Sequence, residues 1–394
     1  MGGETGFERI PQSEVDFLGT RPIPAKPYYD PDWFELEREA VFRRTWQCIG
    51  HVCELPENGS FIRREVEVLR ASLLVVRGKD GEIRAFHNVC THRGTQLVEE
   101  AQGKRTKFSC PYHMWTYGAD GALISAPDFD QFHVEKEDCA LKQVALEICA
   151  GLIFVHLGKD PQPLREWLGP LAEQMETLPV ARATTFTEYS YEIDANWKLA
   201  YDNFQENYHL RFIHSRSGKP TFSDDNPFGY PAEFGFHGPH RTQQLWSNPE
   251  AVSPPYQATA FGLMIPKATE KGLMNTEHGR KYFALFPSFF MLGTPVQHFV
   301  HVVYPLSAEK SRGVIRLYWV DEDGDASERY AREAIAVTAH DVHCEDVDVI
   351  EAGQRGISSG ALDHIHMQTQ EALCRHLFNT VEEMVDDYRA ETGQ

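Results

Sequence analysis

Long apolar stretches are missing from this chain, and so is any excess of positive charge. The longest apolar run, Ile148–Val155, is much shorter than the ~18 residues that a membrane helix needs. Lys and Arg number 38 against 58 Asp and Glu, which gives a net charge of −20. Nucleic acids and anionic membranes attract basic surfaces, so we expect neither kind of partner.

Cysteine is also scarce, with 8 residues among 394. That density is too low for a small disulfide scaffold. The first ten residues are polar and lack the basic-then-apolar pattern of a signal peptide. Two cysteines, Cys90 and Cys110, lie close to histidines, a pairing that in a reducing compartment indicates metal binding. The sequence therefore predicts a cytoplasmic protein.

The chain is rich in core-forming residues, with 42% apolar residues and 7 Trp, 15 Tyr and 24 Phe. Residues 1–46 form a Pro-rich lead-in and a short helix over 32–46. Short β-type runs separated by turn signals fill 47–160, and helices alternate with strands over 161–394. Longer helices are expected over 163–178, 196–212, 326–352 and 364–389, a strand over 185–193, and a loop-rich stretch over 215–280. These patterns predict an α+β protein in which a small all-β domain precedes an α+β domain.

Two Cys/His pairs lie in the predicted β domain. Cys90 and His92 form the first pair, and Cys110 and His113 form the second, each on a turn between β-type runs. Thiolate and imidazole are both metal ligands, and the short offsets let one loop present both groups. A structural zinc site uses the same ligand types, but zinc fingers usually group their cysteines together and their histidines together. One Cys and one His on each loop instead favour a [2Fe–2S] centre with two ligands of each kind.

A second group of candidate ligands lies in the segment 196–214. Asp202, Glu206 and His209 recur at +4 and +3, on a largely different helix face from an aromatic stripe. His214 follows five residues after His209, about 140° further round an ideal helix. Because one straight helix would not aim both imidazoles at one point, we expect the helix to bulge or end between residues 210 and 213.

The predicted helix over 326–352 supplies a third candidate ligand. Its inward stripe consists of Ile335, Ala339, Val342, Asp346, Val349 and Gly353. Asp346 is the only charge on that stripe, and a buried carboxylate is costly unless it is paired or bound to metal. Glu345 is the next candidate, although it falls with Asp341 and Asp348 on a face that looks solvated. Two histidines and one carboxylate are the ligand set of many non-haem iron sites.

Together these motifs resemble the Rieske ring-hydroxylating oxygenase family. The sequences CTHRG from Cys90 and CPYH from Cys110 resemble its cluster motif, and an acid-x₂-His-x₄-His motif with a distant carboxylate resembles its catalytic motif. The resemblance spans about residues 40–360. It departs at Met114, where the family usually has Gly. Glu206 stands where many aromatic dioxygenases of the family have Asp, which resembles the branch acting on carnitine or glycine betaine.

The resemblance implies a Rieske [2Fe–2S] domain over 47–160 and a helix-grip catalytic domain over 161–394, with residues 1–46 packed on the latter. Cys90, His92, Cys110 and His113 would hold the cluster. His209, His214 and Asp346 would hold a mononuclear Fe(II), with the candidate catalytic residues Glu206, Asn203 and Tyr208 beside it. The expected activity is O₂-dependent hydroxylation or dihydroxylation of an aromatic or hydrophobic small molecule. Demethylation or hydroxylation of a quaternary amine is the alternative.

The resemblance also implies partners. The chain has no G-x-G-x-x-G motif after a strand, so electrons would come from a separate NAD(P)H-dependent reductase, with or without a ferredoxin. A homotrimer is expected, with or without a small β subunit, in which Glu206 bridges to His113 of a neighbouring copy. A pure electron-transfer protein would leave the second ligand set unexplained. A zinc-bearing binding protein would explain neither the interval between the two Cys/His pairs nor the second ligand set.

Overall fold

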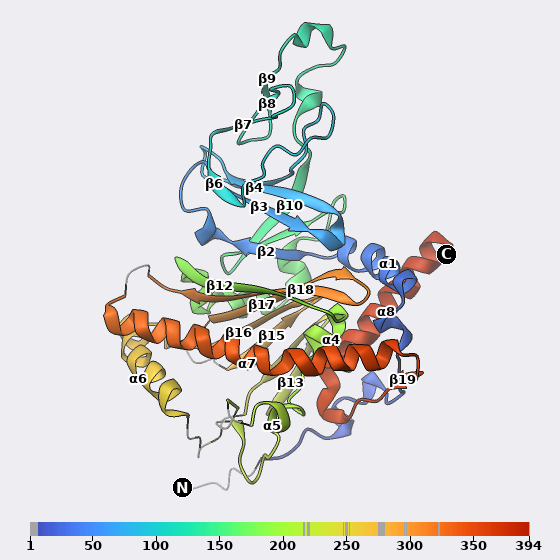
Figure 1. Cartoon of the computed structure of the whole chain (residues 1–394), viewed down its shortest axis with the longest axis vertical. Helices are drawn as coiled ribbons and strands as arrows, with labels where there is room; N and C mark the ends of the chain where they lie inside the picture. Colours follow the sequence, from blue (N-terminus) through green and yellow to red (C-terminus); the bar gives the residue numbers. More distant parts are fainter. Residues whose placement is uncertain are drawn as a thin grey trace. The chain divides into compact units, whose positions relative to one another are not determined.

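A computed structural model of the protein describes residues 7–393, except 216, 219–220, 247, 249–250, 252, 275–279, 295, 297 and 322–323. The first six residues of the polar N-terminus lie outside this range. The chain divides into two compact units, one made of Phe42–Trp167 and the other of Met1–Val41 with Leu168–Gln394 (Figure 1). Among the described residues, no helix is both long and apolar enough to cross a bilayer.

The first unit is built almost entirely of antiparallel strands. A seven-stranded sheet has the order β2-β11-β10-β5-β4-β3-β6, and a three-stranded sheet has the order β7-β8-β9. The strands are β2 Gln47–His51, β3 Ser60–Val66, β4 Ala71–Arg77, β5 Ile83–His87, β6 Gln102–Lys104, β7 Lys107–Ser109, β8 Thr116–Gly118, β9 Leu123–Ser125, β10 Gln143–Cys149 and β11 Leu152–His156. Side chains from both sheets share one apolar core that includes Leu74, Phe86, Phe108 and Tyr117. The predicted small all-β domain is confirmed.

The limits of this unit differ slightly from the predicted 47–160. Trp46 Nε1 donates to the Gln162 carbonyl at 3.0 Å. The short helix α2, Leu164–Leu168, begins where the Leu164 N–H donates to the Glu147 carboxylate of β10 at 3.2 Å. These bonds tie the segment after residue 160 to the β unit, which is why the division falls after Trp167.

The second unit contains one seven-stranded antiparallel sheet in the order β12-β18-β17-β16-β15-β14-β13. Its strands are β12 Thr185–Ile193, β13 Glu233–His237, β14 His240–Gln244, β15 Lys281–Leu285, β16 Phe289–Gly293, β17 His298–Ser307 and β18 Lys310–Trp319. Its helices are α1 Pro31–Ala40, α3 Leu171–Glu176, α4 Trp197–Asp202, α5 Leu210–Ile213, α6 Pro255–Glu270, α7 Ala326–Ser358 and α8 Ala372–Thr392. α7 is the longest helix drawn and runs across the sheet (Figure 1). The expected α+β domain is confirmed.

Several predicted elements need correction. The helix expected over 163–178 is split into α2 and α3, because Gly169 adopts a positive φ of 56° and Pro170 follows it. The stretch over 215–280, expected to be loop-rich, also contains β13, β14 and α6. The helix expected over 364–389 begins only at Ala372, since residues 364–365 form the short strand β19 with β1, Ile23–Pro24.

The N-terminal segment is part of the second unit. Asp30 caps α1 by accepting the Asp32 N–H at 2.9 Å, with Pro31 as the first helical residue. From α1 the fully buried Glu37 accepts hydrogen bonds from Lys198 and from Trp197 Nε1, the latter at 2.7 Å. A buried ion pair with a second donor fixes the start of α4, the helix that leads into the second group of candidate ligands.

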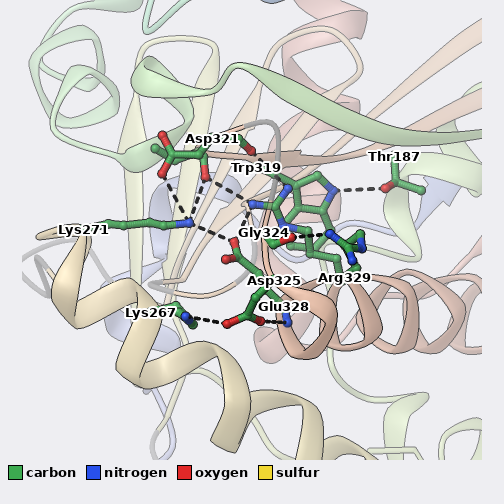
Figure 2. A network of polar contacts seen from close by, with 11 residues as sticks. Thr187, Lys267, Lys271, Trp319, Asp321, Gly324, Asp325, Glu328 and Arg329 are labelled. Carbon is green, nitrogen blue, oxygen red and sulfur yellow. Dashed lines mark hydrogen bonds and ion pairs between the residues drawn. The ribbon is translucent and has the colours of Figure 1, made fainter.

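A charge network joins α6 to the first turns of α7 (Figure 2). Asp325 caps α7 by accepting the Glu328 N–H at 2.9 Å, and it also pairs with Lys267 of α6 at 2.8 Å. The buried Glu328 carboxylate accepts from Lys271 at 2.8 Å and from Arg332 at 2.5 Å. Burial alone would raise the pKa of Glu328, but these two hydrogen bonds hold that pKa below its usual range.

We expect Glu328→Gln to destabilise the protein by about 3 kcal/mol, because it leaves the Lys271 and Arg332 charges without their buried partner. Lys267→Ala, which breaks a more exposed pair in the same network, should cost under about 1 kcal/mol. Urea denaturation followed by Trp fluorescence measures both. Because the folded pKa of Glu328 is lowered, its contribution is present at neutral pH and is lost as pH falls through that pKa. The gap between wild type and Glu328→Gln should therefore close in acid, and a constant gap would contradict this assignment.

Candidate metal centres

The two Cys/His pairs lie on two loops of the all-β unit. Cys90 and His92 follow β5, and Cys110 and His113 lie between β7 and β8. The loops share one backbone pattern, since the Gly94 N–H donates to the Cys90 carbonyl at 2.9 Å and the Met114 N–H donates to the Cys110 carbonyl at 3.0 Å. Both thiols are buried, at 2% and 1% exposure. The structure thus brings all four predicted ligands onto matched turns.

Met114 occupies the position at which the resembled family usually has Gly. Its φ of 59° matches the left-handed conformation of Gly94, whose φ is 81°, in the first loop. A side chain in that region costs about 1–2 kcal/mol. The Met114 side chain is 58% exposed, so it meets no crowding. The substitution therefore keeps the shape of the turn at a cost in backbone strain.

The donor atoms fit a [2Fe–2S] cluster. The His92 and His113 rings have centroids 4.7 Å apart, and the buried Nδ1 atom of each has no hydrogen-bond partner. Trp115 stacks on His92 with centroids 4.9 Å apart, which fixes the orientation of that ring. Two buried thiols and two unpaired imidazole nitrogens match a cluster with two Cys and two His ligands. The assignment of these four residues as its ligands stays a prediction.

The helix predicted over 196–212 is wrong in its middle. Asn196 caps α4 by accepting the Lys198 N–H, but α4 ends at Asp202, and α5 begins only at Leu210. The reason is local: the Glu206 carboxylate accepts the N–H groups of Tyr208 and His209, which competes with helical hydrogen bonding. The break therefore precedes α5 instead of lying within residues 210–213.

This break solves the geometric problem posed by the histidine spacing. His209 and His214 flank α5, a single short helix, as its N-terminal and C-terminal boundary residues. Their Nε2 atoms lie 3.7 Å and 3.1 Å from Oδ1 of Asp346 on α7. All three residues offer donor atoms within 4.8 Å of one another. Residues from α5 and α7 are thus brought together as the sequence predicted.

Asp346 shows why this group suits a metal ion. The residue is 2% exposed, and its Oδ1 atom has no hydrogen-bond partner. A buried carboxylate facing two imidazoles is stabilised by a cation, and two His with one Asp form an open-sided set that suits Fe(II). The residues fit the predicted mononuclear iron. Their role as its ligands stays a prediction.

Two further carboxylates orient the histidines from behind. The Nδ1 atom of His209 hydrogen-bonds Glu206, and Nδ1 of His214 hydrogen-bonds Glu345 at 2.6 Å. Glu345 also accepts from Ser217 at 2.7 Å. Such contacts direct the opposite ring nitrogen, Nε2, toward Asp346. The sequence placed Glu345 on a solvated face. Its position beside Asp346 was the only available signal of this role.

The two remaining predicted catalytic residues, Asn203 and Tyr208, lie in different surroundings. Asn203 lies beside Glu206 in the wall of the cavity described below. Tyr208 is 45% exposed, packs near Phe228 and lies outside the described cavity lining. Asp202 is buried at the end of α4. Burial raises its pKa to about 8, with Arg241 and Lys198 opposing that effect.

The inward stripe of α7 also needs correction. Ile335, Asp346 and Ile350 are buried as a helical period requires, but Val349 is 44% exposed and Gly353 is exposed. His343, three residues before Asp346, is buried at 3% exposure and shares the inward face with Val342, but the predicted stripe included only Val342. The predicted stripe took one residue per turn, whereas the inward face is wide enough for both Val342 and His343, so the sequence missed this histidine.

A cavity of about 280 Å³ opens beside the His209, His214 and Asp346 group. Its walls are mostly aromatic and aliphatic, and the described lining contains no Lys or Arg. The apolar lining residues are Phe204, Leu210, Ala260, Phe261, Tyr282, Phe290, Leu292, Phe299, Ile335, Ala339 and Val342. A metal ion held by His209, His214 and Asp346 would therefore face an apolar molecule bound in this cavity of the second unit.

Comparisons with known families cover both units. Residues 45–144 match the Rieske [2Fe-2S] domain, and residues 180–387 match the catalytic domain of the ring hydroxylating alpha subunit. A Rieske cluster and a mononuclear iron are the cofactors of these domains. The chain thus combines both parts expected from the two ligand sets.

Individual relatives align over most of the chain. The glycine betaine monooxygenase oxygenase subunit of Pseudomonas aeruginosa is 28% identical over 90% of this chain and 87% of its own length. The carnitine monooxygenase oxygenase subunit of Escherichia coli is 30% identical over 86% and 84%. Naphthalene 1,2-dioxygenase from a Rhodococcus species has the same fold, with a TM-score of 0.76, 21% identity, and 95% and 97% coverage.

We expect Asp346→Ala to lose the mononuclear iron while the visible absorption of the cluster is retained, because only the carboxylate between the two Nε2 atoms is removed. Glu345→Ala should keep iron with an affinity reduced about 10–100-fold, since it removes only an orienting contact. Metal analysis and visible spectroscopy of both variants make the comparison. If Glu345→Ala loses iron and Asp346→Ala retains it, the third ligand is Glu345.

Proposed function

This chain belongs to the family of Rieske ring-hydroxylating oxygenases, and we propose that it oxidises an aromatic or other hydrophobic small molecule with O₂. When bound, the cluster supplies single electrons and the mononuclear iron supplies O₂ activation. In this proposal Glu206 and Glu345 orient the two histidine ligands of the iron. The apolar side chains of the cavity wall enclose the substrate. Electrons come from a separate reductase.

The observation that carries this proposal is the composition of the cavity wall. Rings such as Phe204, Phe290 and Phe299 face one space with the donor group, which suits a planar apolar molecule. Carnitine and glycine betaine each carry a carboxylate, and burying a carboxylate is costly without a cationic or strong hydrogen-bonding partner. The described lining offers no Lys or Arg for that purpose.

Oxidation of a quaternary amine is the second candidate. Relatives that act on glycine betaine and carnitine, at 28% and 30% identity, favour it. The aromatic walls could also hold a quaternary ammonium group over ring faces. Substrate class is therefore the point on which the two candidates differ.

A single-turnover assay distinguishes the two. The holoenzyme is reduced chemically, so that no reductase needs to be identified, and is then exposed to O₂ with naphthalene, indole, glycine betaine or carnitine. We expect hydroxylated products from the arenes. Formaldehyde or an aldehyde from the amines, with no arene product, would establish the second candidate instead.

We further propose that the enzyme is a homotrimer in which Glu206 connects the mononuclear iron to the cluster of a neighbouring copy. Glu206 contacts His209 and lines two hollows, the substrate cavity and a depression of about 330 Å³ bordered by Ile350, Glu371 and Cys374. A neighbouring copy that enters this depression would reach Glu206 without crossing the substrate cavity. His113, the ligand on the second cluster loop, is the expected contact.

We expect Glu206→Gln to retain both metal centres and the trimer but to slow oxidation of the reduced cluster at least about tenfold, because it removes the bridging charge. Glu345→Gln is the matched control. It alters the same kind of contact, on His214, outside the described lining of the second depression. Stopped-flow absorbance with substrate and O₂ measures both rates. Equal rates in the two variants, or an active monomer, would contradict the bridging role.

A further inference from the structure

α7 presents one face to the substrate cavity. The residues on this face are Ile335, Thr338, Ala339, Val342, His343 and Asp346. Asp346 belongs to the candidate metal site, and Thr338 donates its hydroxyl to the Ala334 carbonyl at 2.7 Å. His343 is therefore the polar side chain on this face that has no assigned role.

The hydrogen-bonding capacity of His343 is unused. The residue is 3% exposed, and neither ring nitrogen has a hydrogen-bond partner. Two other polar side chains of the described lining are hydrogen-bonded within the protein: Asn207 donates to the Gly229 carbonyl at 2.6 Å, and Ser217 donates to Glu345. A buried donor and acceptor are rarely left unpaired in a folded protein unless a bound molecule completes them.

Neighbouring rings hold the His343 imidazole in place. The Tyr191 ring lies against it with centroids 3.9 Å apart, and Phe204 lies nearly parallel to it at 6.1 Å. The Tyr191 hydroxyl is already hydrogen-bonded to His301 Nε2 at 2.7 Å. Burial lowers the pKa of His343 to about 4, so at neutral pH its imidazole is uncharged and has one N–H donor and one acceptor.

We propose that His343 positions the substrate by hydrogen-bonding a neutral oxygen on an otherwise apolar molecule, such as an aryl ketone or a phenol. This inference rests on the proposed function and narrows its substrate class. A ketone accepts the imidazole N–H, whereas a phenol satisfies either nitrogen. A quaternary ammonium group has no N–H to donate and cannot accept a hydrogen bond, so a quaternary amine could pair with His343 only through another group, such as its carboxylate.

The position of His343 on α7 determines where a hydrogen-bonded substrate would lie relative to Asp346. His343 precedes Asp346 by three residues, so the anchored oxygen would lie about one helical turn from the metal-binding carboxylate. Fixing one atom at that distance restricts which carbon of the substrate faces the donor group. His343 is thus a positioning residue and not a ligand.

The test uses the metal-loaded enzyme and two probes that differ in one carbonyl, 1-indanone and indane. Equilibrium binding, followed by protein fluorescence, should show about tenfold tighter binding of 1-indanone to the wild type, because one hydrogen bond is added. His343→Phe keeps an aromatic ring but has no nitrogen. It should lose this preference while its affinity for indane stays within about twofold.

His343→Gln retains a side-chain N–H and should keep part of the preference for 1-indanone. It tests the same position with a second variant, in case the Phe variant does not fold. Metal content and the cluster spectrum of each variant should match those of the wild type. Absence of measurable 1-indanone binding to the wild type, or the same preference in wild type and His343→Phe, would overturn the inference.

Product analysis separates this inference from the proposed function. If the probes bind as expected but neither is oxidised in a single turnover, the arene-oxidation proposal fails and the anchoring role stands. If arenes are oxidised and His343→Phe leaves both the binding preference and the product pattern unchanged, only the anchoring role fails. We expect His343→Phe to yield a mixture of 1-indanone oxidation products where the wild type yields mainly one.

Discussion

A carboxylate removed from water needs a positive charge beside it, and the folded second unit places Asp346 in that situation. Its carboxylate faces the two imidazoles whose far nitrogens are already engaged by Glu206 and Glu345. A cation bound between the carboxylate and the two imidazoles would stabilise this group. The break before α5 places the two flanking histidines on the same side as Asp346. The length of α7 brings Asp346 to them, so the three side chains meet at one point.

The parts of the site that could be read from the sequence were those set by short spacings or by a lone charge in an apolar pattern. Cys90 and His92, and likewise Cys110 and His113, are close in sequence, so any turn that presents one residue presents the other. Asp346 stood out because a helical period buried it among apolar residues. Both units of the fold followed from the change from β-type runs to mixed elements.

Contacts between distant segments, and contacts between side chains and the backbone, could not be read in the same way. The Glu206 carboxylate ends helical hydrogen bonding by capping two N–H groups, and no periodicity records such a bond. Glu345 looked solvated because its partner, His214, is far away in the sequence. His343 was missed because the predicted stripe took one residue per turn, whereas the inward face of α7 includes both Val342 and His343.

The α7 helix lines the cavity and also carries the Asp346 carboxylate, so each cavity-facing position on it lies at a fixed distance from that carboxylate. Its cavity-facing positions are spaced at intervals of about one turn, roughly 5.4 Å, measured from Asp346. Moving a polar side chain from one cavity-facing position of α7 to the next would shift a bound molecule by about that length, and the candidate metal ligands would stay in place. Enzymes descended from a common ancestor could in this way diverge in the carbon they oxidise while inheriting the same metal chemistry unchanged.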